Sequence, residues 1–171
     1  MHLFIPTGLI GHIGISLAAA YLLRLNLAVA VFCGILPDLV DKPLTALLGL
    51  TQGRYIGHTL LFIFLIAAAF FIWKKKYGVA ALVGGVSHLL LDLEGFVPWF
   101  YPFVRYQFEH GRVDYVTYFR QYFTLSHIGI ELMIVALTGL ILFLARQLYL
   151  WNKEEGRLSV PASISRYLKR K

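Results

Sequence analysis

Long apolar blocks, each ended by charged residues or proline, are the feature that most restricts how this chain of 171 residues can fold. Hydrophobic residues make up 58% of the sequence, and its mean hydropathy is +0.69. Soluble domains are only about 45–50% apolar. Apolar blocks of this length suit the core of a bilayer, where a helix satisfies its own backbone hydrogen bonds. The sequence therefore predicts an all-α integral membrane protein.

The blocks divide residues 1–150 into about five hydrophobic helices of one transmembrane domain. We expect spans over about residues 8–23, 27–36, 58–73, 77–92 and 125–144. The second span should be interrupted at residues 37–43, because two prolines and three charges disfavour a continuous lipid-facing helix. A further apolar stretch follows it, up to Leu50.

The connection between the fourth and fifth spans, residues 94–125, combines many aromatic side chains with Arg105, Arg112 and Arg120. Aromatic rings and basic groups of this kind settle in the headgroup layer of a membrane. We expect interfacial aromatic-rich helices or a re-entrant cap here. The segment is either a belt that only anchors the protein or a lid that binds lipid.

The formal net charge of +7 arises mainly at the ends of the predicted spans. Arg24, Lys74–Lys76 and the tail after Arg146 hold most of the basic residues. This is the pattern of cytoplasmic anchors on a membrane protein, so we expect membrane lipids and not nucleic acid as partners. It predicts a multi-pass protein of the cell membrane with an outside N-terminus, five crossings and a basic cytoplasmic tail at residues 151–171.

Two histidine–carboxylate pairs share one helical spacing. His88 and Asp92 lie four residues apart near the end of the fourth span, as do His127 and Glu131 at the start of the fifth. Residues at positions i and i+4 share a helical face, so each pair can hold a metal ion. Such groups are costly inside a membrane, which implies a partner or a function.

The order of the spans brings these pairs to the same membrane face as other polar residues. Successive spans alternate in direction, and each polar group lies at the outward end of its span. A lone histidine of this kind is more often a packing residue, and the competing explanation for the whole set is a proton or ion pathway. We predict a metal centre at the outer face with the ligands His12, Asp38, His58, His88, Asp92, His127 and Glu131.

Imidazole and carboxylate ligands favour zinc, iron or manganese, because magnesium and calcium prefer shells made only of oxygen. We expect one or two divalent ions, zinc before the others, and Asp38 or Asp92 could bridge two of them. Such ions polarise a phosphoryl or carbonyl oxygen and lower the pKa of a bound water to about 7.

Asp41 and Arg54 are the candidate catalytic residues. Asp41 is expected to be an additional ligand or a base beside the ligands, and Arg54, together with Lys42, can bind a substrate phosphate. The alternatives are that Asp41 simply pairs with Lys42 or Arg54 and that the cations cap helix ends. Gly84-Gly85 should allow close helix packing beside the site.

The chain resembles the membrane-bound metal-dependent hydrolases, which include the LexA-regulated inner-membrane hydrolases of bacteria. The resemblance covers about residues 8–131. Its motifs are Gly-His12, Leu-Pro-Asp38-Leu-Val-Asp41-Lys-Pro, Gly-Arg54-Tyr-Ile-Gly-His58-Thr-Leu and Gly-x-x-Ser-His88-Leu-Leu-Leu-Asp92.

A more distant similarity links the chain to the soluble, all-helical superfamily of zinc-dependent phospholipase C and nucleases, whose site holds three zinc ions. The seven predicted ligands occur in the same order and with the same pair spacings. That superfamily also uses its mature N-terminal residue and a further histidine soon after the His-x-x-x-Asp pair. This chain has Pro98-Trp99 where that further histidine would lie. This departure from the superfamily's pattern implies one or two metal ions here instead of three.

The function expected from these features is a membrane-embedded metal-dependent hydrolase. Its substrate would be a phosphoester of a lipid or a lipid-linked molecule. An ion or metal transporter is one alternative, and a non-catalytic membrane factor with a structural metal site is another.

Overall fold

The structure is a computed structural model that describes residues 8–51, 53–93, 96–111 and 124–154. Within those residues the only β contact is an isolated bridge between Leu50 and His110. The expected all-α fold is therefore confirmed for the described residues, with five helices, of which one is long and apolar and two are shorter and apolar. The helices are α1 (Leu9–Leu22), α2 (Leu27–Leu48), α3 (Leu60–Trp73), α4 (Lys75–Leu91) and α6 (Leu125–Glu154).

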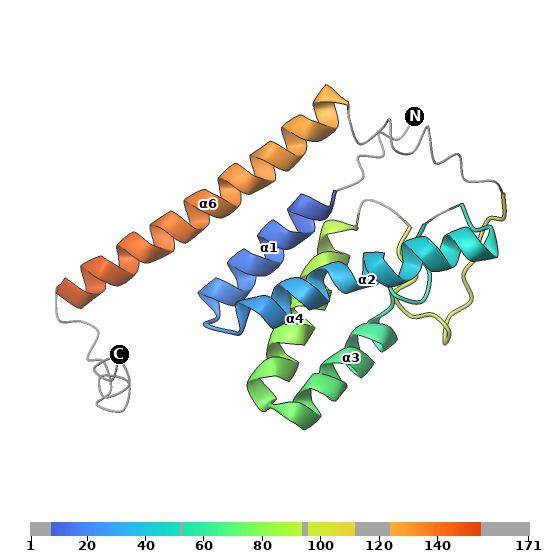
Figure 1. The fold of residues 1–171 in the computed structure, drawn as a ribbon, viewed down its shortest axis with the longest axis horizontal. Coiled ribbons are helices and arrows are strands. Elements are labelled where there is room, and N and C mark those ends of the chain that lie inside the picture. The colour runs from blue at the N-terminus through green and yellow to red at the C-terminus, as the bar shows by residue number, and fades with distance from the viewer. Residues whose placement is uncertain (1–7, 52, 94–95, 112–123, 155–171) are drawn as a thin grey trace.

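Helix α4 lies in the middle of the bundle and packs against α1, α2 and α3, whereas α6 lies along α1 on the outside (Figure 1). Two adjacent glycines of α4 make this packing possible. A Cβ on Gly84 would lie 2.0 Å from the carbonyl oxygen of Ala30 in α2. A Cβ on Gly85 would lie 2.6 Å from the side chain of Ile63 in α3. The close packing expected at this glycine pair is confirmed.

Helix α2 runs without interruption through Pro37 and Pro43, so the break expected at residues 37–43 is wrong. That expectation assumed a lipid-facing helix, but Asp38 and Asp41 are both buried against the protein. A helix tolerates proline in a membrane protein where its neighbours satisfy the freed backbone groups. The consequence is that both aspartates are held on one rigid helix.

The interfacial helices expected between the fourth and fifth spans are absent from residues 96–111, where the chain forms turns. The rest of that segment, residues 112–123, lies outside the described residues. The described turns are fastened to the connection between α2 and α3. The Thr51 N–H donates to the Glu109 carbonyl at 3.0 Å, and the Gly111 N–H donates to the Gly49 carbonyl at 2.9 Å. At the start of α3, the Leu60 N–H donates to the Trp99 carbonyl at 2.9 Å.

Aromatic rings fill the space between these two connections. Phe108 packs edge-to-face against both Tyr55 and Tyr101, with ring centroids 4.9 and 5.4 Å apart. The hydroxyl groups of Tyr55 and Tyr101 lie 3.0 Å apart and share a hydrogen bond. Together the two connections cover the end of the bundle at which α3 begins and α4 ends.

One stretch of the described residues, His127–Asn152 in α6, is long and apolar enough to cross a bilayer. Only 11% of the most apolar 18-residue stretch of this helix is buried in the protein. Helices α1 and α3 are apolar but have 14 residues each. That corresponds to about 21 Å, against a hydrocarbon core of roughly 30 Å. Five crossings therefore remain a prediction.

Helix α6 continues to Glu154, past the domain boundary expected at residue 150. The remainder of the tail, residues 155–171, lies outside the described residues. The division into a transmembrane domain and a basic cytoplasmic tail stays a prediction.

Candidate metal centre

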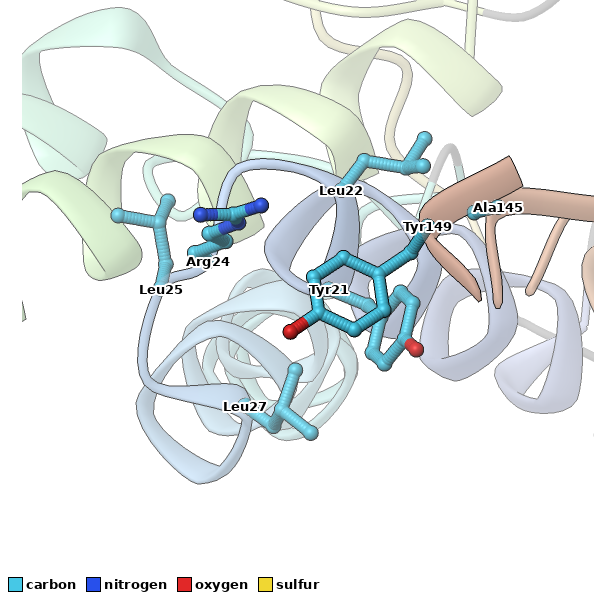
Figure 2. A pocket seen from close by; sticks show the side chains of 7 residues that line it. All are labelled: Tyr21, Leu22, Arg24, Leu25, Leu27, Ala145 and Tyr149. Atoms are coloured by element: carbon cyan, nitrogen blue, oxygen red, sulfur yellow. The ribbon is translucent and has the colours of Figure 1, made fainter. Parts of the chain in front are cut away.

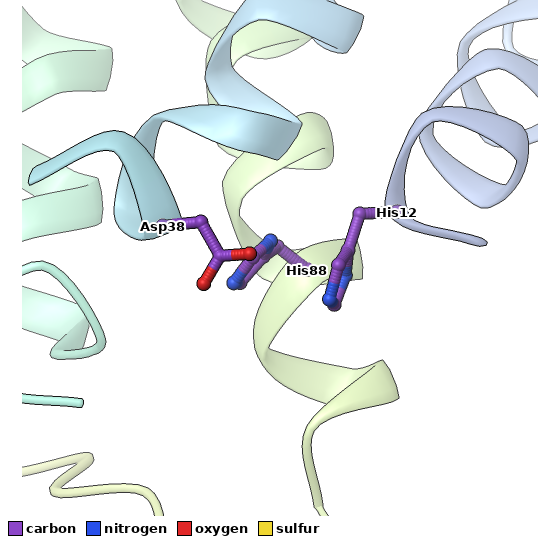
Figure 3. Close-up of side chains that lie close together, drawn as sticks. All are labelled: His12, Asp38 and His88. Carbon is purple, nitrogen blue, oxygen red and sulfur yellow. The ribbon is translucent and has the colours of Figure 1, made fainter. Parts of the chain in front are cut away.

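Five buried histidine and aspartate side chains from four segments of the chain meet at one end of the bundle. They form two overlapping groups of three, and within each group the potential ligand atoms all lie within 4.8 Å of one another. Figure 3 shows the first group, with side chains from α1, α2 and α4 pointing toward one another. The groups are His12, Asp38 and His88, and His58, His88 and Asp92.

His88 belongs to both groups. Its Nδ1 donates a hydrogen bond to the carbonyl of Gly34 in α2 at 2.6 Å. That bond leaves Nε2 facing the cluster, 3.1 Å from Nε2 of His58 and 3.5 Å from Oδ2 of Asp92. The ring also stacks on His12, with centroids 3.8 Å apart. Because a single imidazole nitrogen binds one ion, the two groups describe one shared site.

Asp41 holds the loop that carries His58. Its Oδ2 accepts hydrogen bonds from Nδ1 of His58 at 2.7 Å, from the His58 N–H at 3.0 Å and from the Tyr55 N–H at 2.6 Å. Its Oδ1 accepts from the Gly57 N–H at 2.7 Å. A Cβ on Gly57 would lie 2.8 Å from the carbonyl oxygen of Pro37, so this tight approach requires glycine. Asp41 thereby directs Nε2 of His58 toward the cluster.

His58 lies in the connection before α3, and its Nε2, which faces the cluster, is close to two carboxylates. Nε2 is 3.2 Å from Oδ2 of Asp92 and 3.6 Å from Oδ1 of Asp38. The site thus favours a positive charge at this position, either a proton or a metal ion.

Asp38 and Asp92 use their oxygens in the same divided way. One oxygen of each lies near Nε2 of His58, and the other accepts a hydrogen bond from a cation. In Asp92 the oxygen bound to the cation, Oδ1, also lies 3.7 Å from Nε2 of His12. Lys42 Nζ lies 2.7 Å from Oδ2 of Asp38, and Arg54 Nη2 lies 2.7 Å from Oδ1 of Asp92. Metal ligands in proteins are commonly oriented by such surrounding hydrogen bonds.

His127 and Glu131 are buried but belong to neither group. The Glu131 carboxylate accepts hydrogen bonds from the Gly8 N–H and, at 2.7 Å, from the Gly11 N–H. Nε2 of His127 lies 3.9 Å from Oε1 of Glu131. A carboxylate is stabilising at the N-terminus of a helix, so this pair fastens α6 to the start of α1.

Sequence reasoning missed several of the contacts that orient the site. One alternative paired Asp41 with Lys42 or Arg54, whereas these cations pair with Asp38 and Asp92. The spacing of four residues between Asp38 and Lys42 is a signal that could have revealed their pair. The contact between His88 and the Gly34 carbonyl has no comparable signal, because it depends on how α4 crosses α2.

The donor set suits a divalent transition metal. Imidazole nitrogen combined with carboxylate oxygen is the ligand chemistry of zinc, iron and manganese sites. His58 and His88 each use Nδ1 for a hydrogen bond and present Nε2, the arrangement that fixes a ligating histidine in its tautomer. The cluster can therefore hold a metal ion.

Fold and site together define a helical protein with one long, apolar and largely unburied helix and a buried histidine–aspartate cluster that could hold a metal. The chain belongs to the YdjM inner membrane protein family, which matches it over residues 2–155. No curated protein and no solved structure matches it. Membership confirms the expected membrane location at the level of an inner membrane protein, and the family description names no reaction.

Proposed function

We propose that this chain is a metal-dependent hydrolase embedded in the membrane, which cleaves a phosphoester of a lipid or a lipid-linked substrate. The convergence of three histidines and two aspartates, buried at one end of the bundle, is the observation that carries the proposal. The motif resemblance to membrane-bound metal-dependent hydrolases rests on these same residues and favours hydrolysis over other uses of a metal.

The ion would be held by His12, Asp38, His58, His88 and Asp92, with zinc the best match to the donors. When bound, it would supply a Lewis acid for a phosphoryl oxygen and lower the pKa of an attacking water. The shared Nε2 of His88 favours one ion over two. His127 and Glu131 would then hold α1 in place, so that His12 stays in the cluster.

Asp41 and Arg54 receive different roles. Both oxygens of Asp41 accept hydrogen bonds from residues 55–58, so Asp41 acts through His58 as a positioning residue. The Arg54 side chain is 12% exposed, against 2% for its partner Asp92, which places the guanidinium at the outer boundary of the cluster. From there the guanidinium, which also donates to Asp92 and to the Phe96 carbonyl, can bind the substrate phosphate.

The connections around residues 50–59 and 96–111 would cover the site and admit the lipid from the side. Their clustered tyrosine and phenylalanine rings suit contact with a headgroup and the upper part of an acyl chain. The basic anchors at the other end of the helices favour a site on the outer face of the membrane.

A transporter or a structural metal site would use the same ligands. The packing beyond the cluster argues against a polar path through the bundle. Buried alanines of α1, α2 and α4 pack together there, namely Ala20, Ala30 and Ala80. The motif resemblance to membrane-bound metal-dependent hydrolases is what favours hydrolysis over a purely structural ion.

The test is phosphoester cleavage by the purified, zinc-loaded protein in liposomes, across a panel of phospholipids and polyprenyl phosphoesters, followed as release of either free phosphate or a phosphorylated headgroup. We expect turnover by the wild type and a loss of at least 100-fold in His88→Gln and Asp92→Asn. The matched control is His110→Ala, which changes an exposed histidine outside the cluster.

Three outcomes would contradict the hydrolase. Equal turnover in the wild type and both variants would mean that the cluster does not catalyse the reaction. Zinc flux across the liposomes without cleavage would indicate a transporter. Bound zinc with neither flux nor cleavage would indicate a structural metal site.

A further inference from the structure

A second site lies at the other end of α1 from the histidine cluster. A pocket of about 490 Å³ opens where the end of α1 and the start of α2 meet the later turns of α6 (Figure 2). Its lining combines apolar side chains with two phenol groups and one guanidinium group. The lining residues are Tyr21, Leu22, Arg24, Leu25, Leu27, Ala145 and Tyr149.

Arg24 occupies a backbone position that normally favours glycine. Its φ is 54°, in the left-handed region, directly after the end of α1. The Arg24 N–H donates to the Tyr21 carbonyl at 3.1 Å, and the Leu25 N–H donates to the Ala20 carbonyl at 2.8 Å. This is the Schellman ending of a helix, in which glycine is the usual left-handed residue.

The chain therefore keeps a long cationic side chain where glycine would suit the backbone better. A rarely populated backbone conformation of a residue other than glycine is a reason to look for a function of its side chain. In this protein that side chain lines the pocket. The backbone conformation and the position in the pocket are thus two independent indications that the Arg24 guanidinium binds a ligand.

The surroundings of the pocket are basic and apolar together. Arg146 follows the lining residue Ala145. At the same end of the bundle Lys74 lies between α3 and α4, and Lys75 and Lys76 begin α4. The apolar side chains of α6 near the pocket, including Phe143 and Leu148, are exposed. A ligand that fits here carries negative charge at one end and apolar chains at the other.

We propose that this pocket binds the headgroup of an anionic phospholipid. The Arg24 guanidinium would donate two parallel hydrogen bonds to the lipid phosphate. The hydroxyls of Tyr21 and Tyr149 would add polar contacts at the membrane–water boundary, where tyrosine is favoured. The acyl chains would run along Leu22, Leu27 and the exposed face of α6. The site is separate from the metal centre and does not depend on metal.

Native mass spectrometry of the delipidated full-length chain, titrated with phosphatidylglycerol, tests this site. We expect at least a tenfold preference for phosphatidylglycerol over phosphatidylcholine. Arg24→Gly should weaken phosphatidylglycerol binding at least tenfold while keeping the thermal stability, because glycine suits the backbone at φ 54°. Arg24→Gln repeats the loss of charge with a side chain of similar length. Gly129→Ala, near the start of α6 and away from the pocket, is the control, because nothing lies within 4 Å of a Cβ there.

Three results would overturn the proposal. One is unchanged phosphatidylglycerol binding in both Arg24 variants, and another is equal binding of phosphatidylcholine by the wild type. The third is binding of soluble glycerol 3-phosphate as tight as that of the lipid, which would make this a site for a free phosphate group. None of these results depends on hydrolysis, so the proposed function is tested separately.

Discussion

At the scale of single residues, hydrogen bonds made away from the cluster decide how its side chains can act. Nδ1 of His88 is engaged by the Gly34 carbonyl, and Nδ1 of His58 by Asp41. Each histidine therefore presents the nitrogen that a metal needs. Residues that never touch the ion should accordingly influence its affinity.

Asp41→Asn tests this influence. The amide cannot offer carboxylate oxygens to His58 Nδ1 and three backbone N–H groups at once, so the orientation of the ring should loosen. Loss of such a supporting contact typically weakens metal affinity about 10–100-fold. Competition with a chromophoric zinc chelator measures it. The control Glu109→Gln alters an exposed carboxylate, and equal zinc affinity in both variants would contradict the assigned role.

At the scale of helices, the closest approach in the bundle lies between α4 and α2. Gly84 lies against the backbone of Ala30, so an added methyl group meets atoms that cannot rotate away. The same approach sets the distance between His88 and Gly34, since both contacts join α2 and α4. Helix packing and site geometry are therefore linked.

Gly84→Ala should destabilise the protein by about 1–3 kcal/mol or more through overpacking. Gly139→Ala in α6 is the matched control, because nothing lies within 4 Å of a Cβ there. It should change stability by no more than about 1 kcal/mol. Thermal unfolding in detergent compares the two. Equal melting temperatures would show that α2 and α4 are not this close.

The helices and their order were predictable, because they follow from apolar blocks and charged breaks. The single continuous helix through Pro37 and Pro43 was not, since the sequence does not tell whether that stretch faces lipid or protein. Likewise, His127–Glu131 has the same spacing as His88–Asp92. Only the packing of α6 on α1 shows that Glu131 meets the N-terminus of α1.

At the scale of the whole molecule, two chemically different ends are separated by apolar packing. The histidine–aspartate cluster lies at one end under aromatic connections, and Arg24 with Lys74–Lys76 lies at the other. In a membrane this difference in charge between the two ends predicts a fixed orientation, with the basic end in the cytoplasm.

Cysteine labelling in intact cells tests the orientation. The single native cysteine, Cys33, is buried and is first replaced by alanine. In that background Gln107→Cys, in the exposed aromatic loop, should react with a membrane-impermeant maleimide. Lys76→Cys should react only after the cells are permeabilised. The reverse pattern would place the candidate metal centre on the cytoplasmic face.

We predict that His12, Asp38, His58, His88 and Asp92 form one metal site. Zinc stoichiometry of the purified protein, combined with X-ray absorption at the zinc edge, tests it most directly. We predict one ion per chain with histidine nitrogen at about 2.0–2.1 Å, lost in His88→Gln and retained in His110→Ala. A wild type that holds no metal after zinc loading, or a His88→Gln variant that binds zinc as the wild type does, would contradict the claim.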